Sequence, residues 1–382
     1  MTDEDLHSHL LNRQGSRQSL NTPVLVVDLD ALTRNIERMA AFARDHGVQL
    51  RPHAKTHKSP DIARLQVKAG AIGICCAKIG EAEALADDGV TLGLHITSPV
   101  VSAPAIERLI ALNLRTEGLM CVVDNPLNAQ ALAAAAQDHG KQLNVLIDID
   151  PGIRRTGVGS AADAVALFKA IEAQEILRYI GVQCYCGAQQ HIESYAARSE
   201  AMEDRAGFVR GVIAALTEAG GAPKIVTGGG TGTHRIDVAL DLFTELQVGS
   251  YVFMDAQYLA CDLTGEEGAA APFETSLMID ARVVSANTPG LVTLDAGFKA
   301  FSTDAGPPEV LSGAPDGAKY RFMGDEHGAL ILREGGTLPL AHVVTLGAPH
   351  CDPTVNLYDT YHVVQGDTLR ALWPVAARGR SR

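Results

Sequence analysis

The sequence predicts an α/β fold, in which a parallel (β/α)8 barrel is followed by a mainly antiparallel β domain. Short apolar segments of strand character alternate with segments of helical periodicity about eight times before residue 271, which is the chain order of such a barrel. Beyond that point short β-prone runs follow one another, separated by Gly, Pro and Asp. An open doubly wound sheet is the alternative for the first part, but no GxGxxG motif follows its first strand.

The chain opens with a polar stretch, residues 1–21, which we expect to be a loosely held arm. Residues 23–29 form a strongly β-prone run. Asp30 can cap the helix that follows, because apolar residues such as Leu32 and Ile36 are spaced there to form one buried face.

Strands and helices of the barrel then alternate. The predicted strands are short and apolar, and lie at 49–51, 72–76, 92–96, 119–123, 144–149, 179–185, 224–226 and 246–253. The predicted helices lie between them, at 60–69, 79–87, 104–112, 125–139, 162–173, 192–219 and 234–244. The β domain is predicted from further strand-like runs at 277–279, 282–284, 291–294, 329–332, 342–346 and 361–364.

Composition excludes several classes of protein. The chain has 382 residues, 46% of them hydrophobic, and a formal net charge of −13 without a long basic block, so we expect neither nucleic acid nor a membrane as a partner. No apolar run reaches the length of a membrane span. The first residues are polar and acidic, unlike a signal peptide, and the seven cysteines form no CxxC pair. We therefore expect a cytoplasmic protein with reduced thiols.

Residues 51–58, RPHAKTHK, begin at the last residue of the first predicted barrel strand. Pro52 and Pro60 disfavour a continuous helix across this stretch. At the end of a buried strand Lys55 would be short of water, and the pKa of its ammonium should fall. A lysine that forms a Schiff base needs such a lowered pKa. A basic surface loop is the alternative interpretation.

A glycine-rich turn, TGGGTGT at residues 227–233, follows the seventh predicted strand. Its glycines allow the backbone to approach an anion closely, and barrel enzymes often hold phosphate at this position. A tight flexible turn is the alternative. A phosphate cradle here and a lysine after the first strand together indicate pyridoxal phosphate (PLP), whose phosphate and aldehyde they would bind.

Other polar residues also follow barrel strands, where such enzymes place their active sites. They are Lys78, Thr97, Ser98, Asp124, Asn125, Arg154, Arg155, Tyr185 and the run 249–251. We expect Lys78 to be a surface lysine at the start of a helix.

Two further motifs lie in the predicted β domain. In PHCDPT at 349–354, an extended chain would turn His350 and Asp352 to one side and Cys351 to the other. An imidazole and a carboxylate so placed can share a divalent metal, Mn²⁺, Mg²⁺ or Zn²⁺. A histidine that only supports the structure is the commoner case. GDEHG at 324–328 is either an acidic hairpin turn or a further functional motif.

Several ordered motifs resemble one known family. They are PVLVVDL at 23–29, RPHAKTHK, GICCAKIGEAEAL at 73–85, TGGGTGT, GSYVFMD at 249–255, GDEHG and PHCDPTVNLYD at 349–359. Together they resemble the D-threonine aldolase and D-serine dehydratase family, whose members are fold-type III PLP enzymes related to alanine racemase.

The resemblance implies roles for individual residues. Lys55 would form the Schiff base, Arg155 would contact the ring oxygen of the cofactor, and Tyr185 its ring nitrogen. A base, either His191 near the substrate hydroxyl or a water on the metal, would take the hydroxyl proton. The cofactor phosphate would be surrounded by Thr227, Gly229, Gly230, Thr231, Gly249, Ser250 and Tyr251. The metal, Mn²⁺ before Mg²⁺ or Zn²⁺, would be held by His350 and Asp352.

In this family the first strand usually joins the β domain. We therefore expect a barrel of residues 31–270 that binds PLP, and a β domain of residues 1–30 and 271–382 that carries the metal. The resemblance also implies a homodimer whose active sites lie between the barrel and the partner's β domain.

The resemblance implies D-threonine aldolase activity first, which is the cleavage of a D-3-hydroxy-amino acid to glycine and an aldehyde. The His-x-Asp pair favours it over the dehydratase branch, which tends to have His-x-Cys. Cys186 departs from the pattern, because aldolases more often show histidine there. The alternatives are a 3-hydroxy-D-aspartate aldolase, a D-serine or D-threo-3-hydroxyaspartate dehydratase, a metal-free racemase, and a PLP carrier without turnover, which the metal pair disfavours.

Overall fold

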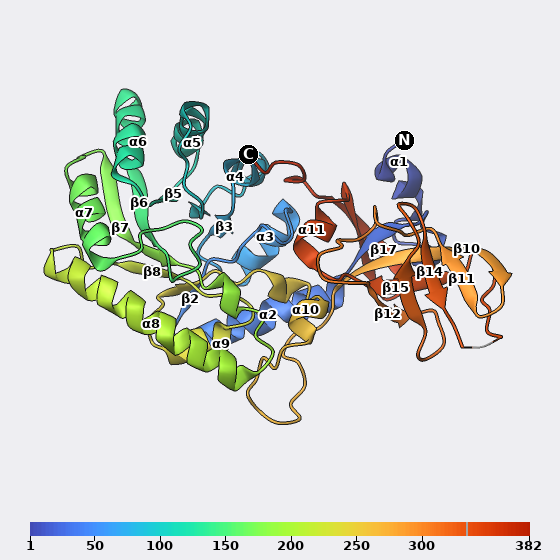
Figure 1. The fold of residues 1–382 in the computed structure, drawn as a ribbon. Helices are drawn as coiled ribbons and strands as arrows, with labels where there is room; N and C mark the ends of the chain where they lie inside the picture. The colour runs from blue at the N-terminus through green and yellow to red at the C-terminus, as the bar shows by residue number, and fades with distance from the viewer. Residues whose placement is uncertain (334) are drawn as a thin grey trace.

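A computed structural model describes residues 1–333 and 335–382 and contains two sheets (Figure 1). The first has eight parallel strands in the order β2-β9-β8-β7-β6-β5-β4-β3. Their bounds are β2 (Gln49–Leu50), β3 (Ile74–Cys76), β4 (Leu94–Ile96), β5 (Met120–Val123), β6 (Leu143–Ile149), β7 (Leu177–Cys184), β8 (Ile225–Gly228) and β9 (Glu245–Leu246). A parallel bridge between His53 and Cys75 joins the two edges, which confirms the predicted barrel.

One helix, α2, precedes the first barrel strand and the others follow the strands, and the local sequence explains where they begin. They are α2 (Leu29–Asp45), α3 (Pro60–Lys68), α4 (Ile79–Asp87), α5 (Ala103–Arg115), α6 (Pro126–His139), α7 (Ala161–Glu172), α8 (Tyr195–Glu218), α9 (His234–Ala239) and α10 (Ala256–Leu259). Asn125 and Ser160 cap α6 and α7 by accepting backbone N–H bonds, and Asp28, rather than the predicted Asp30, caps α2.

Two predicted elements end earlier than expected. The helix α9 stops at Ala239 because Asp241, two residues later, adopts a positive φ of 49°. The predicted strand at 246–253 is wrong beyond Leu246, since η4 (Ser250–Val252) is a short 3-10 helix. There the N–H of Tyr251 donates to Oγ1 of Thr231 (3.0 Å) instead of to a neighbouring strand.

The second sheet has nine strands, and β1 (Val24–Asp28) lies within it, antiparallel to β10 (Leu277–Thr288) and parallel to β16 (Thr360–Gln365). The others are β11 (Leu291–Leu294), β12 (Glu309–Ser312), β13 (Lys319–Phe322), β14 (Gly328–Ile331), β15 (Val343–Gly347) and β17 (Thr368–Pro374). The runs predicted at 277–279 and 282–284 form a single strand, and GDEHG is the turn between β13 and β14. The domain limits expected above stay a proposal.

The N-terminal arm is ordered, so the expectation of a loosely held segment is wrong. It contains α1 (Asp3–His7), η1 (Ser8–Leu10) and η2 (Ser16–Ser19). His7 is fully buried and bonds to His362 of β16 (2.8 Å), and Arg17 pairs with Asp280 of β10 (2.8 Å). These partners lie far along the chain, so a local sequence pattern does not predict them.

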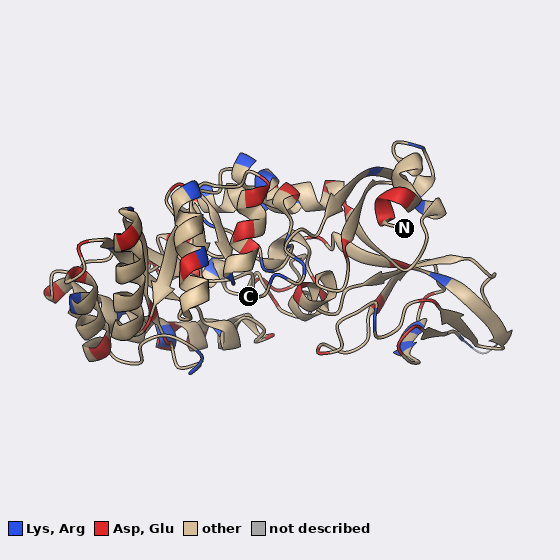
Figure 2. Ribbon diagram, turned by 90° about the horizontal axis from the view of Figure 1, so that it is seen from above, with Lys and Arg blue, Asp and Glu red and all other residues tan. Residues whose placement is uncertain are grey.

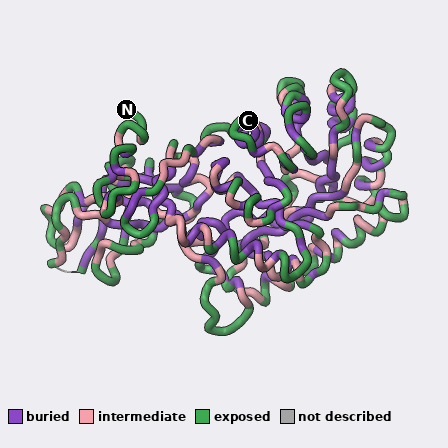
Figure 3. Tube along the Cα trace, turned by 180° about the vertical axis from the view of Figure 1, so that it is seen from behind, coloured by how far each residue is buried: buried purple, intermediate pink, exposed green. Residues whose placement is uncertain are grey.

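One hydrophobic core runs from the β domain into the base of the barrel. It includes Leu32 and Met39 of α2, Leu246 of β9, and Leu277 and Val363 of the second sheet. Figure 3 shows buried chain continuing from one sheet to the other. The two parts of the molecule are therefore joined by packed side chains, which fixes how their facing surfaces meet.

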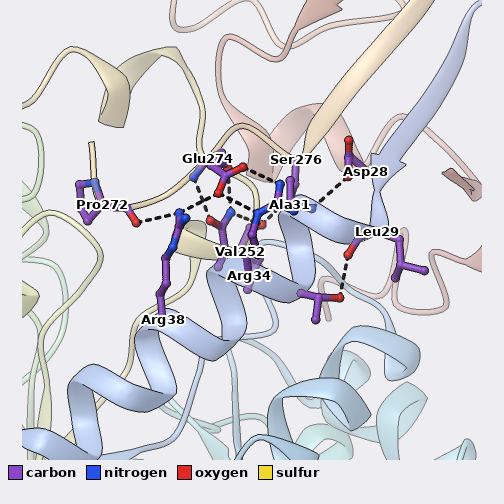
Figure 4. A network of polar contacts seen from close by, with 11 residues as sticks. Asp28, Leu29, Ala31, Arg34, Arg38, Val252, Pro272, Glu274 and Ser276 are labelled. Carbon is purple, nitrogen blue, oxygen red and sulfur yellow. Dashed lines mark hydrogen bonds and ion pairs between the residues drawn. The ribbon is translucent and has the colours of Figure 1, made fainter. Parts of the chain in front are cut away.

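A polar network reinforces this junction (Figure 4). Arg34 and Arg38 of α2 pair with Glu274 (2.6 and 2.8 Å), which precedes β10. The buried amide of Asn35 donates to the carbonyls of Val252 (3.2 Å) and Glu274 (2.7 Å). On the side of the second sheet that faces the barrel lies a short helix, α11 (Cys351–Val355) (Figure 1).

Acidic and basic residues are interspersed along the outer helices of the barrel, and α1 is acidic (Figure 2). None of the described helices combines the length and the apolar character that a membrane crossing needs.

Candidate active site

Lys55 lies in the loop that follows β2. Its side chain lines a pocket of about 450 Å³ together with Thr97, Asp124, Arg155 and Tyr185, which follow β4, β5, β6 and β7. The carboxyl ends of parallel barrel strands meet at one face, so these predicted residues come together as expected.

Asp352, from α11, does not line this pocket but contacts Lys55. Its Oδ2 lies 3.4 Å from Nζ of Lys55, and its Oδ1 is buried without a hydrogen-bond partner among the described residues. The carboxylate raises the pKa of the Lys55 ammonium, and this effect outweighs the lowering by burial. The predicted fall in the Lys55 pKa is therefore wrong here, because the sequence does not show this counter-charge.

Arg155 and Tyr185, the residues expected at the cofactor ring, lie against each other. The Arg155 guanidinium carbon is 5.6 Å from the centre of the Tyr185 ring, and Nζ of Lys55 is 5.7 Å from it. Cys186, next in the chain, is only 2% exposed and packs in the barrel core. Cys186 therefore does not line the pocket.

Close packing explains the glycines around the expected phosphate site. A Cβ on Gly230 would lie 2.4 Å from Oε1 of Gln190, so no larger residue fits without moving that side chain. On the adjacent turn, a Cβ on Gly249 would lie 3.0 Å from the buried, unpartnered hydroxyl of Thr56. The two turns thus form a tight cradle whose shape depends on glycine.

Backbone donors of this cradle are free to bind an anion. Oγ1 of Thr231 accepts the N–H of Tyr251, which ties the glycine-rich turn to η4. Within the described chain, the N–H groups of Thr231 and Ser250 meet no hydrogen-bond acceptor. Free N–H groups on adjoining turns fit a phosphate. Thr227 differs, because its hydroxyl accepts from Gln247 (3.0 Å) inside the barrel, and its contact with phosphate stays a prediction.

A buried carboxyl group, Asp237, supports the cradle from below. It accepts a hydrogen bond from the hydroxyl of Thr233 (2.6 Å), and a Cβ on Gly229 would lie 2.5 Å from its Oδ2. Burial raises the pKa of Asp237 to about 7, so at neutral pH it repels a phosphate less than an ordinary carboxylate would. The sequence gives no sign of this role, because an acidic residue on a helix is usually exposed.

His350 and Asp352 lie at the start of α11, and not on the extended chain that was expected. His350 is the N-cap residue and Asp352 is in the first turn. Between them the N–H of Cys351 donates to Asp255 (2.9 Å), and Nδ1 of His350 is 2.7 Å from Oδ2 of Asp304. An imidazole beside a carboxylate with a free oxygen fits Mn²⁺, Mg²⁺ or Zn²⁺.

His191 is exposed and does not line the pocket of Lys55. Its ring packs on Tyr258, with 4.5 Å between ring centres. Burial lowers the pKa of His191, the charges of His350 and Lys55 lower it further, and Asp352 opposes this. The charges of both proposed metal ligands and of Lys55 therefore act on His191, and a neutral imidazole there can accept a proton.

Lys78, expected at the surface, is exposed but also lines the pocket of Lys55. Lys55 and Lys58 each pair with a carboxylate, whereas Lys78 forms no ion pair with any described residue. The pocket therefore holds a cation with no counter-charge of its own.

Polar side chains also fill the barrel interior. His95 bonds to Gln183 (2.8 Å), Gln183 to Asp148 (2.9 Å), and Thr156 to Asp148 (2.7 Å). Burial raises the pKa of Asp148 to about 6 and lowers that of His95 to about 4. The sequence signal for this interior network is a polar residue at the middle of a short apolar strand, as His95 is in β4.

Three potential metal ligands, Asp3, His7 and His362, gather at the N-terminal arm. The N–H of Asn21 donates to Nε2 of His7 (2.9 Å), so neutral His7 carries its proton on Nδ1 and donates it to Nε2 of His362. That tautomer has no lone pair on Nδ1 for a metal. The hydrogen bond between His7 and His362 therefore holds the N-terminal arm against β16.

Comparison with known proteins agrees with this geometry. The family description "Alanine racemase, N-terminal domain" matches residues 27–257, and "Putative serine dehydratase domain" matches residues 276–364. The chain is 39% identical to a 3-hydroxy-D-aspartate aldolase of Paracoccus denitrificans, over 94% of this chain and 93% of that one. It is 38% identical to a D-threonine aldolase of an Arthrobacter species, over 95% and 94%.

Solved structures give the same picture. A D-threonine aldolase from Filomicrobium marinum has a TM-score of 0.90 at 35% identity, covering 96% of this chain and 97% of that one. A D-threo-3-hydroxyaspartate dehydratase from Delftia has a TM-score of 0.82 at 28% identity, covering 94% and 98%. The chain therefore belongs to the D-threonine aldolase and D-serine dehydratase-like family of fold-type III PLP enzymes, which share the alanine racemase fold.

Proposed function

We propose that the chain is a PLP- and metal-dependent aldolase that cleaves D-3-hydroxy-amino acids, D-threonine first, to glycine and an aldehyde. The contact between Lys55 and Asp352, 3.4 Å apart, supports this most. It brings the lysine expected to bind the cofactor and a carboxylate expected to bind the metal to one point. A single substrate can then offer its α-amino group to one and its β-hydroxyl to the other. Relatives named as aldolases, at 38 and 39% identity, support the same class.

Each part of the site has a task in this proposal. Lys55, Arg155, Tyr185 and the two cradle turns would hold PLP, which supplies a sink for the electron pair released at Cα. His350 and Asp352 would hold a divalent cation, Mn²⁺ before Mg²⁺ or Zn²⁺, which supplies acidification of the β-hydroxyl.

Protein side chains would move the protons. His191, kept neutral by its lowered pKa, would accept the proton of the β-hydroxyl at its ring nitrogen. Lys55 holds a proton on Nζ beside Asp352 and would return one to Cα as glycine forms.

Lys78 favours a second candidate substrate, 3-hydroxy-D-aspartate. Such a substrate carries two carboxylates. Arg155 and Lys78 are the cations of the pocket besides Lys55. The second carboxylate would therefore supply the counter-charge that Lys78 lacks.

Product analysis tests these proposals. Purified protein with PLP and Mn²⁺ is given D-threonine and D-threo-3-hydroxyaspartate separately. Glycine with acetaldehyde or glyoxylate is the expected result, and the better substrate decides between the two candidates. Ammonia with a 2-oxo acid and no glycine would make the chain a dehydratase. Racemisation that survives a chelator would indicate a racemase, and cofactor colour without turnover a carrier.

We also propose a homodimer, as the family resemblance implies, that works in the cytoplasm, as the polar N-terminus and the unpaired cysteines indicate. Light scattering of the purified protein checks the oligomeric state, and a monomer that turns over substrate would contradict it.

A further inference from the structure

We infer that Asp304 is a positioning residue of the proposed metal site, whose carboxylate fixes the ring of His350 so that Nε2 is left for the metal. This inference rests on the metal part of the proposed function and adds to it a residue outside every motif recognised in the sequence.

The hydrogen bond between the two side chains determines the tautomer of His350. Its Nδ1 lies 2.7 Å from Oδ2 of Asp304. A carboxylate only accepts hydrogen bonds, so the ring nitrogen must donate, and a neutral imidazole then carries its lone pair on Nε2. A histidine ligand held in this way by a carboxylate is correctly oriented and more basic toward a metal.

The loop that carries Asp304 is built onto the same turn. The hydroxyl of Ser302 donates to the carbonyl of His350 (3.2 Å), and the N–H of Ser302 donates to the hydroxyl of Thr354 (3.0 Å). Thr354 in turn donates to the carbonyl of His350 (2.7 Å). Ser302 and Thr354 are both buried. Asp304 therefore approaches His350 from a fixed backbone, two residues from a buried clamp.

The backbone between the two proposed ligands is held by a separate contact. Asp255 accepts the N–H of Cys351, the residue between His350 and Asp352, at 2.9 Å. The backbone of the pair thus has its own support, and the Asp304 contact is the one that acts on the imidazole ring.

Asp304 contributes little to folding in this arrangement. Its side chain is 53% exposed, and exposed pairs of this kind stabilise a protein weakly. Removal of its carboxylate should therefore leave the fold intact and change only what the ring of His350 can bind.

Titration of the PLP-loaded, chelator-treated protein with Mn²⁺, followed by the EPR signal of free Mn²⁺, tests this inference. We expect Asp304→Ala to raise the Kd for Mn²⁺ by about 10- to 100-fold. Asp304→Asn should raise this Kd less, because an amide oxygen still accepts a hydrogen bond from Nδ1. Asp316→Asn is the matched control: it removes one exposed negative charge from a turn of the same domain and should leave the Kd unchanged.

The outcomes separate the two levels of the proposal. A Kd of Asp304→Ala equal to that of wild type would overturn the inference and leave the metal site standing. A lowered melting temperature with an unchanged Kd would overturn it too, because Asp304 would then be merely structural. Absence of Mn²⁺ binding by the wild type would remove the metal part of the proposed function, and this inference with it.

Discussion

The barrel side and the β-domain side of the proposed site are built differently. On the barrel side, the glycine-rich turn packs against Gln190 and Asp237, and the interior polar groups largely bond to one another. On the β-domain side, the backbone of the His350–Asp352 turn is clamped, but side-chain atoms such as Oδ1 of Asp352 are left open. Changes on the first side should therefore cost stability, and changes on the second side should cost catalytic activity.

Lys55 is the exception that tests this comparison most severely, because it is a chemical group on the barrel side. We expect Lys55→Ala to lower aldehyde release by at least about 10³-fold, since both covalent binding of the cofactor and proton transfer are lost. The absorbance of PLP bound covalently to the lysine should disappear as well. Lys68→Ala, an exposed lysine of α3, is the control. Cofactor absorbance that persisted in Lys55→Ala would remove the lysine assignment.

Breaking the ion pair of Arg51 with Glu245 should show the barrel side as a support. Two contacts of 2.9 and 3.0 Å join the pair, and the side chains are 5% and 3% exposed. Glu245→Ala leaves the buried charge of Arg51 without a counter-charge and should lower the free energy of unfolding by about 3–5 kcal/mol in urea titrations.

The exposed pair of Glu274 with Arg34 is the matched control for that change. Glu274→Ala should cost less than about 1 kcal/mol, because both side chains are more than a third exposed. Equal losses in the two variants would mean that burial does not distinguish the pairs.

Acid should destabilise the molecule through its buried histidines. Burial lowers the pKa to about 4 in each of His57, His95, His234 and His362. A lowered folded-state pKa means that the stability is present above the ordinary value of 6.5 and is lost as the pH falls toward 4. The free energy of unfolding, measured between pH 7 and pH 4, should therefore decrease with acid, and a flat profile would contradict this expectation.

Asp237 acts in the opposite sense and provides the control. Its raised pKa means that its contribution is present at low pH and is lost as the pH rises through about 7. Asp237→Asn can keep the bond from Thr233, and its amide replaces an oxygen that has no partner among the described residues. Because the effect of Asp237 falls between pH 3.8 and about 7, where the histidines also titrate, this variant should lose stability more steeply than the wild type between pH 7 and pH 4.

The smallest expected effect concerns Lys78, at the rim of the pocket. If the second carboxylate of a substrate pairs with its ammonium, Lys78→Met should lower kcat/KM for D-threo-3-hydroxyaspartate about tenfold relative to D-threonine. Lys68→Met controls for the loss of a surface charge. An unchanged ratio would leave Lys78 without a role in substrate choice.

Local periodicity was enough to predict the barrel but only part of the second sheet. The barrel strands are buried on both faces and separated by amphipathic helices, so their pattern is strong. The strand β12 has polar residues at both ends and is largely exposed, so its pattern does not differ from that of a loop. The helix α11 was missed because Pro353 and the short apolar spacing around it favour an extended interpretation.

In the site, the residues that follow strands were predictable, and their supports were not. Lys55, Arg155, Tyr185 and the glycine-rich turn each stand at a strand end, which topology alone brings together. Asp304 and Asp255 act through partners 46 and 96 positions away, and only the folded chain shows these contacts. The roles of the site residues themselves remain predictions for the experiments above to decide.

The position of β1 within the second sheet has a consequence for synthesis of the chain. Its partner β10 begins about 250 residues later, so at roughly 5–20 residues per second β1 waits about 12–50 s after translation for a strand to pair with. During that time an apolar edge is open to other chains. A ribosome-bound chaperone that shields apolar segments should therefore raise the yield of this protein when it acts before residue 277 emerges.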